Sequence, residues 1–223
     1  MSTDDIPLPA EFRQRLDRLL QAGSRRVLGL AGPPGCGKST LAVLLRQWLG
    51  AQAQVVPMDG FHLANTELQR LGLEQRKGAP ETFDSAGYVA LLRRLRTQGL
   101  TGVVYAPDFR REIEEPVAGS IAVQPQTQLL ITEGNYLLLD EGHWADVPSL
   151  LDEVWYLEVE QDLRLARLVE RHVHFGRSRE DAQHWIASND EPNARLIEAS
   201  RQRADAVLRW SEVQTPDRTQ ETA

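Results

Sequence analysis

The chain has a single cysteine, Cys36, among its 223 residues. One cysteine excludes an intramolecular disulfide and a metal cluster held by several thiolates. No apolar run approaches the roughly 18 residues that a membrane-spanning helix needs. The acidic start of the chain, MSTDDIPLPA, lacks the charged-then-apolar pattern of a signal peptide. These absences favour a cytoplasmic protein with no membrane partner.

Positive charge is also scarce. The chain carries 25 Lys and Arg against 32 Asp and Glu, a formal net charge of −7. Domains that bind nucleic acid are usually basic, so the sequence predicts no nucleic-acid partner. The length suits one α/β domain with a complete core. We expect a single domain over residues 1–211, followed by a polar tail over 212–223 that frays.

Apolar runs of strand length alternate with amphipathic helical patterns along most of the chain. This alternation predicts an α/β fold with a mostly parallel, doubly wound sheet between helical layers. An amphipathic helix is expected first, over about 8–21. Strands are expected at 25–32, 53–58, 101–109, 129–132, 154–159 and 204–210, and the main helices at 38–50, 84–99 and 162–176.

The stretch GPPGCGKST, residues 32–40, matches the phosphate-binding pattern G-x-x-x-x-G-K-S and lies between a predicted strand and a predicted helix. Its glycines let backbone N–H groups turn toward phosphate oxygens, and the helix dipole favours the same anion. We expect Lys38 to reach the β- and γ-phosphates of ATP and Ser39 to bind Mg²⁺. The other loop residues expected at the nucleotide are Gly32, Pro33, Gly35, Cys36, Gly37 and Thr40. Cys36 is interpreted as a small tolerated residue.

Two carboxylates follow predicted strands. Glu133 ends the buried run LLITEG, where it can hold Mg²⁺ through water; the alternative is a surface glutamate before a turn. Asp59 follows VVPM, and the alternative for Asp59 is an Asx turn beside Gly60. The chain lacks the N-K-x-D motif of GTPases and the L-S-G-G-Q signature of transport ATPases.

An arginine-rich helix lies further along, with Arg164, Arg167 and Arg171 on one face by the i, i+3, i+7 spacing. Arg177 lies just beyond Gly176. We expect a lid over about 162–180 whose arginines neutralise charge on a transferring phosphoryl group, with Arg177 at the nucleotide. The alternative is a solvated basic face paired with neighbouring glutamates.

The order of these motifs resembles the uridine kinase, phosphoribulokinase and pantothenate kinase family, from about residue 27 to residue 210. MDGFHLAN and RKGAPETFD are similar to segments of type I pantothenate kinases. The chain is also similar to compact bacterial proteins labelled as nucleoside/nucleotide kinases or sometimes fructokinases. The resemblance implies a P-loop NTPase three-layer sandwich with an Arg-rich lid, in which Asp59 contacts the acceptor hydroxyl. A carboxylate there orients the hydroxyl and accepts its proton late.

Polar and aromatic residues in the excursions beyond the strand ends are the expected contacts to the acceptor. They are His62, Lys77, Asp84, Tyr105, Asp108, Arg110, Arg111 and Asn135. Asp84 would otherwise cap the helix from Ser85, and His62 would be a surface residue at a helix start. Further along, helix capping by Asn189 or Asp190 is favoured over a contact to adenine or the lid.

The sequence thus predicts a small-molecule kinase that moves the γ-phosphoryl group of ATP, with Mg²⁺, to a hydroxyl. YAPDFRREIEEP departs from pantothenate kinases, and the Asp-Ser-Phe-Tyr signature of uridine kinases is missing. The acceptor therefore stays open among a nucleoside, a sugar and a pantothenate-like hydroxyl, and a homodimer stays open too. The alternative function is a regulatory nucleotide-binding NTPase, which needs no second pocket opposite the γ-phosphate.

Overall fold

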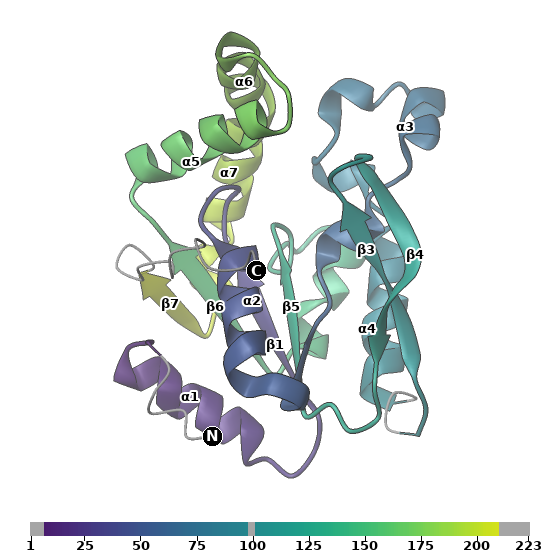
Figure 1. The fold of residues 1–223 in the computed structure, drawn as a ribbon, viewed down its shortest axis with the longest axis vertical. Helices are drawn as coiled ribbons and strands as arrows, with labels where there is room; N and C mark the ends of the chain where they lie inside the picture. Colours follow the sequence, from purple (N-terminus) through teal and green to yellow (C-terminus); the bar gives the residue numbers. More distant parts are fainter. Residues whose placement is uncertain (1–6, 98–100, 210–223) are drawn as a thin grey trace, which may run out of the picture.

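The structure, a computed structural model, describes residues 7–97 and 101–209. Its main sheet has five strands, all paired in parallel, in the order β2-β5-β1-β6-β7 (Figure 1). The predicted α/β class with a doubly wound sheet is confirmed. The strands are β1 (Arg26–Ala31), β2 (Ala53–Val55), β5 (Leu129–Gly134), β6 (Glu153–Glu158) and β7 (Ala206–Arg209). The tail over 212–223 lies outside the described residues.

Alternate side chains of the strands enter two separate cores, as a sheet covered on both faces requires. On one face, Leu28 and Leu30 pack with the apolar sides of α1 (Ala10–Leu20) and α2 (Lys38–Leu49). The rings of Phe12 and Trp155 meet edge to face there, with centroids 4.9 Å apart. The helix expected over 8–21 is therefore present as α1, and its apolar side is buried.

The opposite face is covered by α4 (Ser85–Thr97) and α7 (Glu191–Ala199). Tyr88 of α4 and Ile197 of α7 are buried with Val154 and Tyr156 of β6. The sheet thus lies between two helical layers, which confirms the three-layer sandwich. None of the helices in the described residues is long and apolar enough to cross a membrane.

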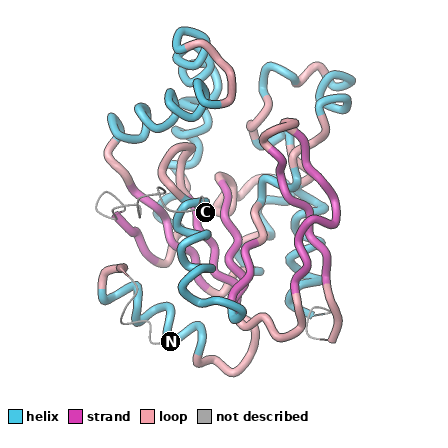
Figure 2. The backbone as a smooth tube through the Cα atoms, in the orientation of Figure 1, coloured by secondary structure: helices cyan, strands magenta, loops and turns pink. Residues whose placement is uncertain are grey.

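One strand prediction needs correction. The stretch 101–109 was expected as a strand of the sheet, followed by a loop. It forms β3 (Val104–Arg110) instead, which pairs antiparallel with β4 (Glu115–Val123) in a separate two-stranded hairpin. Figure 2 shows this hairpin beside the main sheet. The β4 strand was not predicted, because its run of small residues from Ala118 carries no clear alternation.

Two further parts extend beyond the carboxyl edge of the sheet (Figure 1). One is an arm over residues 61–83 that contains α3 (Asn65–Leu71) and short turns. The other is the segment expected as the lid, which contains α5 (Gln161–His174) and α6 (Arg179–Trp185). A π-helical turn, Ile186–Asp190, joins α6 directly to α7. Asp190 makes no side-chain capping bond to α7, so the predicted cap at this position is wrong.

Candidate functional site

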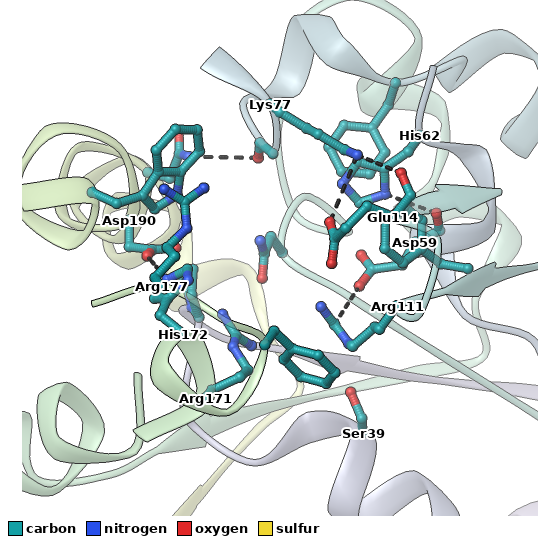
Figure 3. A pocket seen from close by; sticks show the side chains of 18 of the residues that line it. Ser39, Asp59, His62, Lys77, Arg111, Glu114, Arg171, His172, Arg177 and Asp190 are labelled. Carbon is teal, nitrogen blue, oxygen red and sulfur yellow. Dashed lines mark hydrogen bonds and ion pairs between the residues drawn. The ribbon is translucent and has the colours of Figure 1, made fainter. Parts of the chain in front are cut away.

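A cavity of about 810 Å³ lies at the carboxyl ends of β1, β2 and β5, between the arm, the hairpin and the lid (Figure 3). This is the edge at which parallel α/β sheets bind ligands. Pro34, Lys38 and Ser39 line it from the phosphate-binding loop. Asp59 and Glu133 line it from the ends of β2 and β5. One cavity therefore joins the predicted nucleotide residues to the predicted acceptor carboxylate.

The phosphate-binding loop has the backbone that its glycines predict. Gly35 and Gly37 have φ values of 83° and 94°, in the left-handed region that favours glycine. A β-carbon at Gly35 would lie 2.9 Å from the carbonyl oxygen of Arg164, so the loop also needs glycine for space. Lys38 starts α2, and its buried ammonium donates to the carbonyl oxygens of Gly32 and Pro33 at 2.8 and 3.1 Å.

Cys36 is fully buried under this loop. Burial raises the pKa of its thiol, which keeps the sulfur in its unreactive protonated form. Its place against the loop agrees with a small packing residue.

Ser39 and Glu133 form a pair of oxygen groups at the bottom of the cavity. The Ser39 hydroxyl donates to the Glu133 carboxylate over 3.0 Å. Burial raises the pKa of Glu133, and the Asp59 carboxylate raises it further, while Lys38 and the Ser39 hydrogen bond oppose the shift. A hydroxyl beside a carboxylate is a donor set that suits Mg²⁺, so the residues present fit this ion.

Asp59 stands on a short turn, Met58–Phe61, that follows β2. The backbone there packs tightly, because a β-carbon added at Gly60 would lie 2.5 Å from the carbonyl oxygen of Pro107 in β3. The Asp59 carboxylate faces the cavity and accepts from the Arg111 guanidinium at 3.4 Å (Figure 3). The turn therefore fixes the carboxylate between the main sheet and the hairpin.

His62 lines the acceptor side of the cavity. Its ring lies between Phe83 and Phe109, with centroids 4.0 and 4.7 Å away, and its Nδ1 lies 2.8 Å from the carbonyl oxygen of Asp59. Burial lowers the pKa of His62 despite the nearby Asp59 carboxylate, so the ring is neutral at pH 7. The alternative of a solvated surface histidine does not describe this position.

The structure brings Lys77, Arg111 and Asn135 to the same cavity. It leaves four other predicted acceptor residues outside the cavity lining: Asp84, Tyr105, Asp108 and Arg110.

The reasons are local. Asp84 accepts from the backbone N–H of Gly87 at 2.8 Å and caps α4. Tyr105 is 60% exposed on the hairpin. After a register shift between Ala106 and Asp108, Phe109 and Arg111 line the cavity, whereas Asp108 and Arg110 do not.

The arginines of the predicted lid occupy different environments. Arg164 is buried, pairs with Glu191 and donates weakly to the carbonyl oxygen of Pro34. Arg167 is outside the cavity lining. Arg171 lines the cavity, and no hydrogen bond or ion pair joins its side chain to another described residue. Burial, and then the positive charge of Arg111, lower the pKa of Arg171. Asp190, Asp59 and Glu133 oppose this shift from a distance, so Arg171 is a cation that faces the cavity without a direct ion pair among the described residues.

Arg177 lines the outer part of the cavity and stacks on the indole of Trp185, with the guanidinium carbon 4.1 Å from the ring centroid. His172 and Asp190 also line the cavity and pair over 2.8 Å. Sequence reasoning missed further lining residues because their role depends on contacts between distant segments: Phe83, Phe109, Glu114, His172, Phe175 and Trp185. Asn193 of α7 lines the cavity too.

Known proteins are similar to this chain in sequence and in fold. The family model described as "Phosphoribulokinase / Uridine kinase family" matches residues 27–216. A Schizosaccharomyces pombe protein named "Putative uridine kinase C227.14" is 36% identical over 95% of this chain and 94% of its own length. A solved structure titled as a "putative fructose transport system kinase" from Silicibacter sp. TM1040 is 42% identical, with a TM-score of 0.80 over 89% of this chain and 97% of that one.

YFH7 from Saccharomyces cerevisiae, at 20% identity, shares the fold, with a TM-score of 0.75 over 90% of this chain and 97% of that chain. The family model and the S. pombe relative each match most of this chain. The chain therefore belongs to the phosphoribulokinase and uridine kinase family of P-loop kinases.

Proposed function

We propose that this protein transfers the γ-phosphoryl group of ATP to a hydroxyl of a small metabolite. The observation that carries the proposal is the single cavity that Lys38 and Ser39 of the P-loop share with Asp59 and with residues of the arm and the hairpin, which leave room for an acceptor compartment. A nucleotide switch that turns over only water needs no such compartment. The family of the chain and the names of its relatives support a metabolite as acceptor.

In the proposed reaction, the acceptor oxygen forms a bond to the γ-phosphorus while the bond to the β–γ bridging oxygen breaks, and ADP leaves. The hydroxyl proton passes to Asp59 and from there to water. An Asp is far less basic than an alkoxide, so its main contribution is to hold the attacking oxygen in line with the leaving group.

The phosphate side has its own group of residues. Lys38 exchanges the loop carbonyls that it now contacts for phosphate oxygens. Ser39 and Glu133 would hold Mg²⁺, which supplies positive charge to the phosphates when it is bound. Arg171 stabilises the charge that spreads over the transferring group, because its guanidinium faces the cavity without an anion of its own. Arg177, stacked on Trp185, stands at the cavity mouth on the lid.

The test is a coupled ADP-release assay over a panel of hydroxyl acceptors. The panel contains nucleosides including uridine, hexoses including fructose, pantothenate and glycerate, each with ATP and Mg²⁺. The proposal predicts that one acceptor class raises ADP release well above hydrolysis without acceptor. If ATP binds but no acceptor raises turnover, the protein is better described as a regulatory NTPase.

A further inference from the structure

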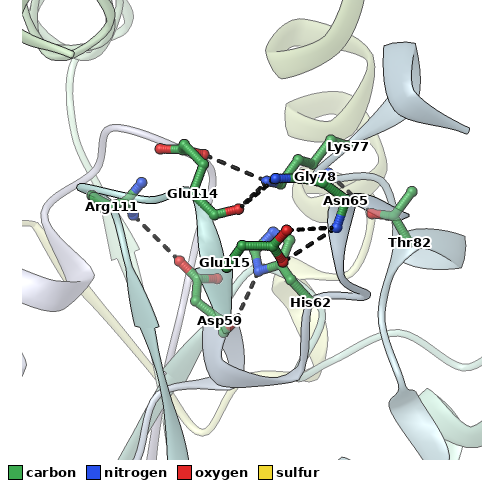
Figure 4. Close-up of polar contacts among 9 residues, drawn as sticks. All are labelled: Asp59, His62, Asn65, Lys77, Gly78, Thr82, Arg111, Glu114 and Glu115. Carbon is green, nitrogen blue, oxygen red and sulfur yellow. Dashed lines mark hydrogen bonds and ion pairs between the residues drawn. The ribbon is translucent and has the colours of Figure 1, made fainter. Parts of the chain in front are cut away.

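The acceptor side of the cavity includes Lys77, whose ammonium group is bound to other residues of the protein. The Lys77 ammonium donates to the Asn65 side-chain oxygen at 2.7 Å and to the Glu114 carbonyl oxygen at 2.6 Å (Figure 4). The Glu114 carboxylate lies 3.7 Å away, and the Phe109 ring centroid 5.3 Å away. Two of the three ammonium hydrogens are therefore engaged in hydrogen bonds within the protein, and the Glu114 carboxylate offsets the charge.

These contacts clamp the tip of the β3–β4 hairpin to the arm. Glu114 has φ 52°, the one positive φ of a non-glycine residue in the described part of the chain. This conformation is unfavourable for a residue with a side chain and persists where the surroundings hold it. The Glu114 carbonyl oxygen accepts from both Lys77 and the Asn65 side chain, and the Glu115 carboxylate accepts from the Asn65 backbone N–H (Figure 4). Lys77 is thus an anchor of this turn.

Among the described residues that line the cavity from the arm and the hairpin, no other cation is left for a ligand anion. Arg111 is paired with Asp59, and burial keeps His62 neutral at pH 7. Glu74 and Glu114 add negative charge to the same wall. Arg171 and Arg177 line the same cavity from the other side, where they belong to the proposed phosphate site. A carboxylate or phosphate of the acceptor would therefore meet no unpaired cation on the arm or the hairpin, and an unpaired buried charge is strongly unfavourable.

The remaining groups suit a neutral polar molecule. Phe83 and Phe109 flank His62, which uses its Nδ1 for the contact to Asp59 and not its Nε2. The side-chain amide of Asn135 lines the same cavity and offers a hydrogen-bond donor and an acceptor. Aromatic rings pack against C–H faces while such amide and imidazole groups bond hydroxyls.

We propose that the acceptor is an uncharged, polyhydroxylated molecule, and that Lys77 is a positioning residue that holds the hairpin tip over this compartment. The inference rests on the proposed kinase activity and narrows its substrate class. It predicts that carboxylate and phosphate derivatives of an acceptor are poor substrates even where the reacting hydroxyl is kept.

The first experiment compares matched acceptors with the full chain, ATP and Mg²⁺. The pairs are fructose with its 1- and 6-monophosphates, uridine with its 3′-monophosphate, glycerol with glycerate, and pantothenol with pantothenate. We expect kcat/KM for the uncharged member of the active pair to exceed that of its charged partner at least about tenfold. Preference for the charged member overturns this inference and leaves the kinase proposal standing. If every pair fails to give acceptor-dependent ADP release, both the substrate-class inference and the kinase proposal are overturned.

The second experiment changes the anchor. Lys77→Met is expected to raise KM for the uncharged acceptor severalfold and to speed backbone hydrogen exchange over residues 111–115. Lys77→Arg is expected to restore part of both. Arg76→Met is the matched control, because Arg76 is the residue before Lys77, its side chain is exposed and paired with Glu81, and it is outside the cavity lining. If Lys77→Met leaves hydrogen exchange and the KM for the uncharged acceptor unchanged, and changes only the KM for charged acceptors, then Lys77 contacts a ligand anion and the inference fails.

Discussion

The Arg111 guanidinium lies 3.4 Å from the Asp59 carboxylate and joins the hairpin tip to the turn after β2. The guanidinium carbon also lies 5.7 Å from the Phe109 ring centroid and 6.0 Å from that of Phe175, at the end of the lid helix α5. One side chain therefore contacts the sheet, the hairpin and the lid. Its position makes the Asp59 carboxylate a fixed group, whose distance to a bound hydroxyl is set by three separate elements.

Asp59→Asn is expected to lower acceptor-dependent kcat by about 10²–10⁴-fold, the range found for a positioned proton acceptor. ATP affinity should change little, because the P-loop contacts are untouched. Steady-state kinetics with the acceptor found in the screen measure the effect. Asp108→Asn serves as the control, since this acid lies on β3 of the hairpin and is outside the cavity lining. Full turnover in Asp59→Asn would exclude the proposed role of this carboxylate.

The part of the site nearest the main sheet could be predicted from the sequence. Gly35, Gly37 and Lys38 act through local backbone geometry, which a nine-residue pattern specifies. Asp59 and Glu133 follow buried apolar runs, and parallel strands bring their carboxyl ends to one edge. Such features need only the local chain and the sheet, so the sequence contains enough information.

On the hairpin side, Lys77 and Arg111 were expected near the acceptor and do line the cavity, but their contacts could not be predicted, because these contacts join segments far apart in the chain. Lys77 and Glu114 are separated by 37 residues, and no local spacing pairs them. The different environments of the arginines in the expected lid could not be predicted either. Arg164 and Arg171 share a helix face, yet seven residues at 1.5 Å each separate them by about 10 Å along the axis. One guanidinium is therefore buried against the P-loop, while the other lines the cavity.

Arg171→Met is expected to lower kcat by about 10³-fold with little change in stability, because this guanidinium makes no direct hydrogen bond or ion pair with a described residue and faces the cavity. Arg167→Met should lose far less activity, since Arg167 is outside the cavity lining. Arg195→Met, exposed on α7, controls for loss of surface charge. Single-turnover kinetics separate the chemical step from ADP release. Equal losses in the Arg171 and Arg167 variants would contradict the assignment of Arg171.

Gly60→Ala is expected to destabilise the protein by about 1–3 kcal/mol and to reduce acceptor turnover. An added β-carbon would lie 2.5 Å from the Pro107 carbonyl oxygen, so the turn that carries Asp59 must move away from β3. Urea unfolding and acceptor kinetics measure the two effects. Gly102→Ala is a matched control, since a β-carbon there meets no atom within 4 Å. Similar stability in the two variants would show that the contact at Gly60 relaxes freely.

The pH dependence of stability should contain a contribution from His62. Burial is the main cause that lowers the pKa of His62 below the usual 6.5, and Lys77 and Arg111 act in the same direction. In acid the unfolded chain then binds a proton that the folded ring resists. The contribution of His62 to stability is therefore complete above about pH 6.5 and is lost as the pH falls toward the lowered value. Stability measured by urea unfolding should decline more steeply between about pH 7.5 and pH 5 in the native chain than in His62→Gln.

The comparison concerns slopes, because His62→Gln also loses ring contacts with Phe83 and Phe109 and will be less stable at every pH. His143→Gln, at an exposed position, is the matched control and should keep the slope of the native chain. A slope in His62→Gln equal to that of the native chain would mean that the folded protein takes up the proton at this position as readily as the unfolded chain. Water would then reach the ring between the two phenylalanines, and the acceptor compartment would be wetter than its buried contacts imply.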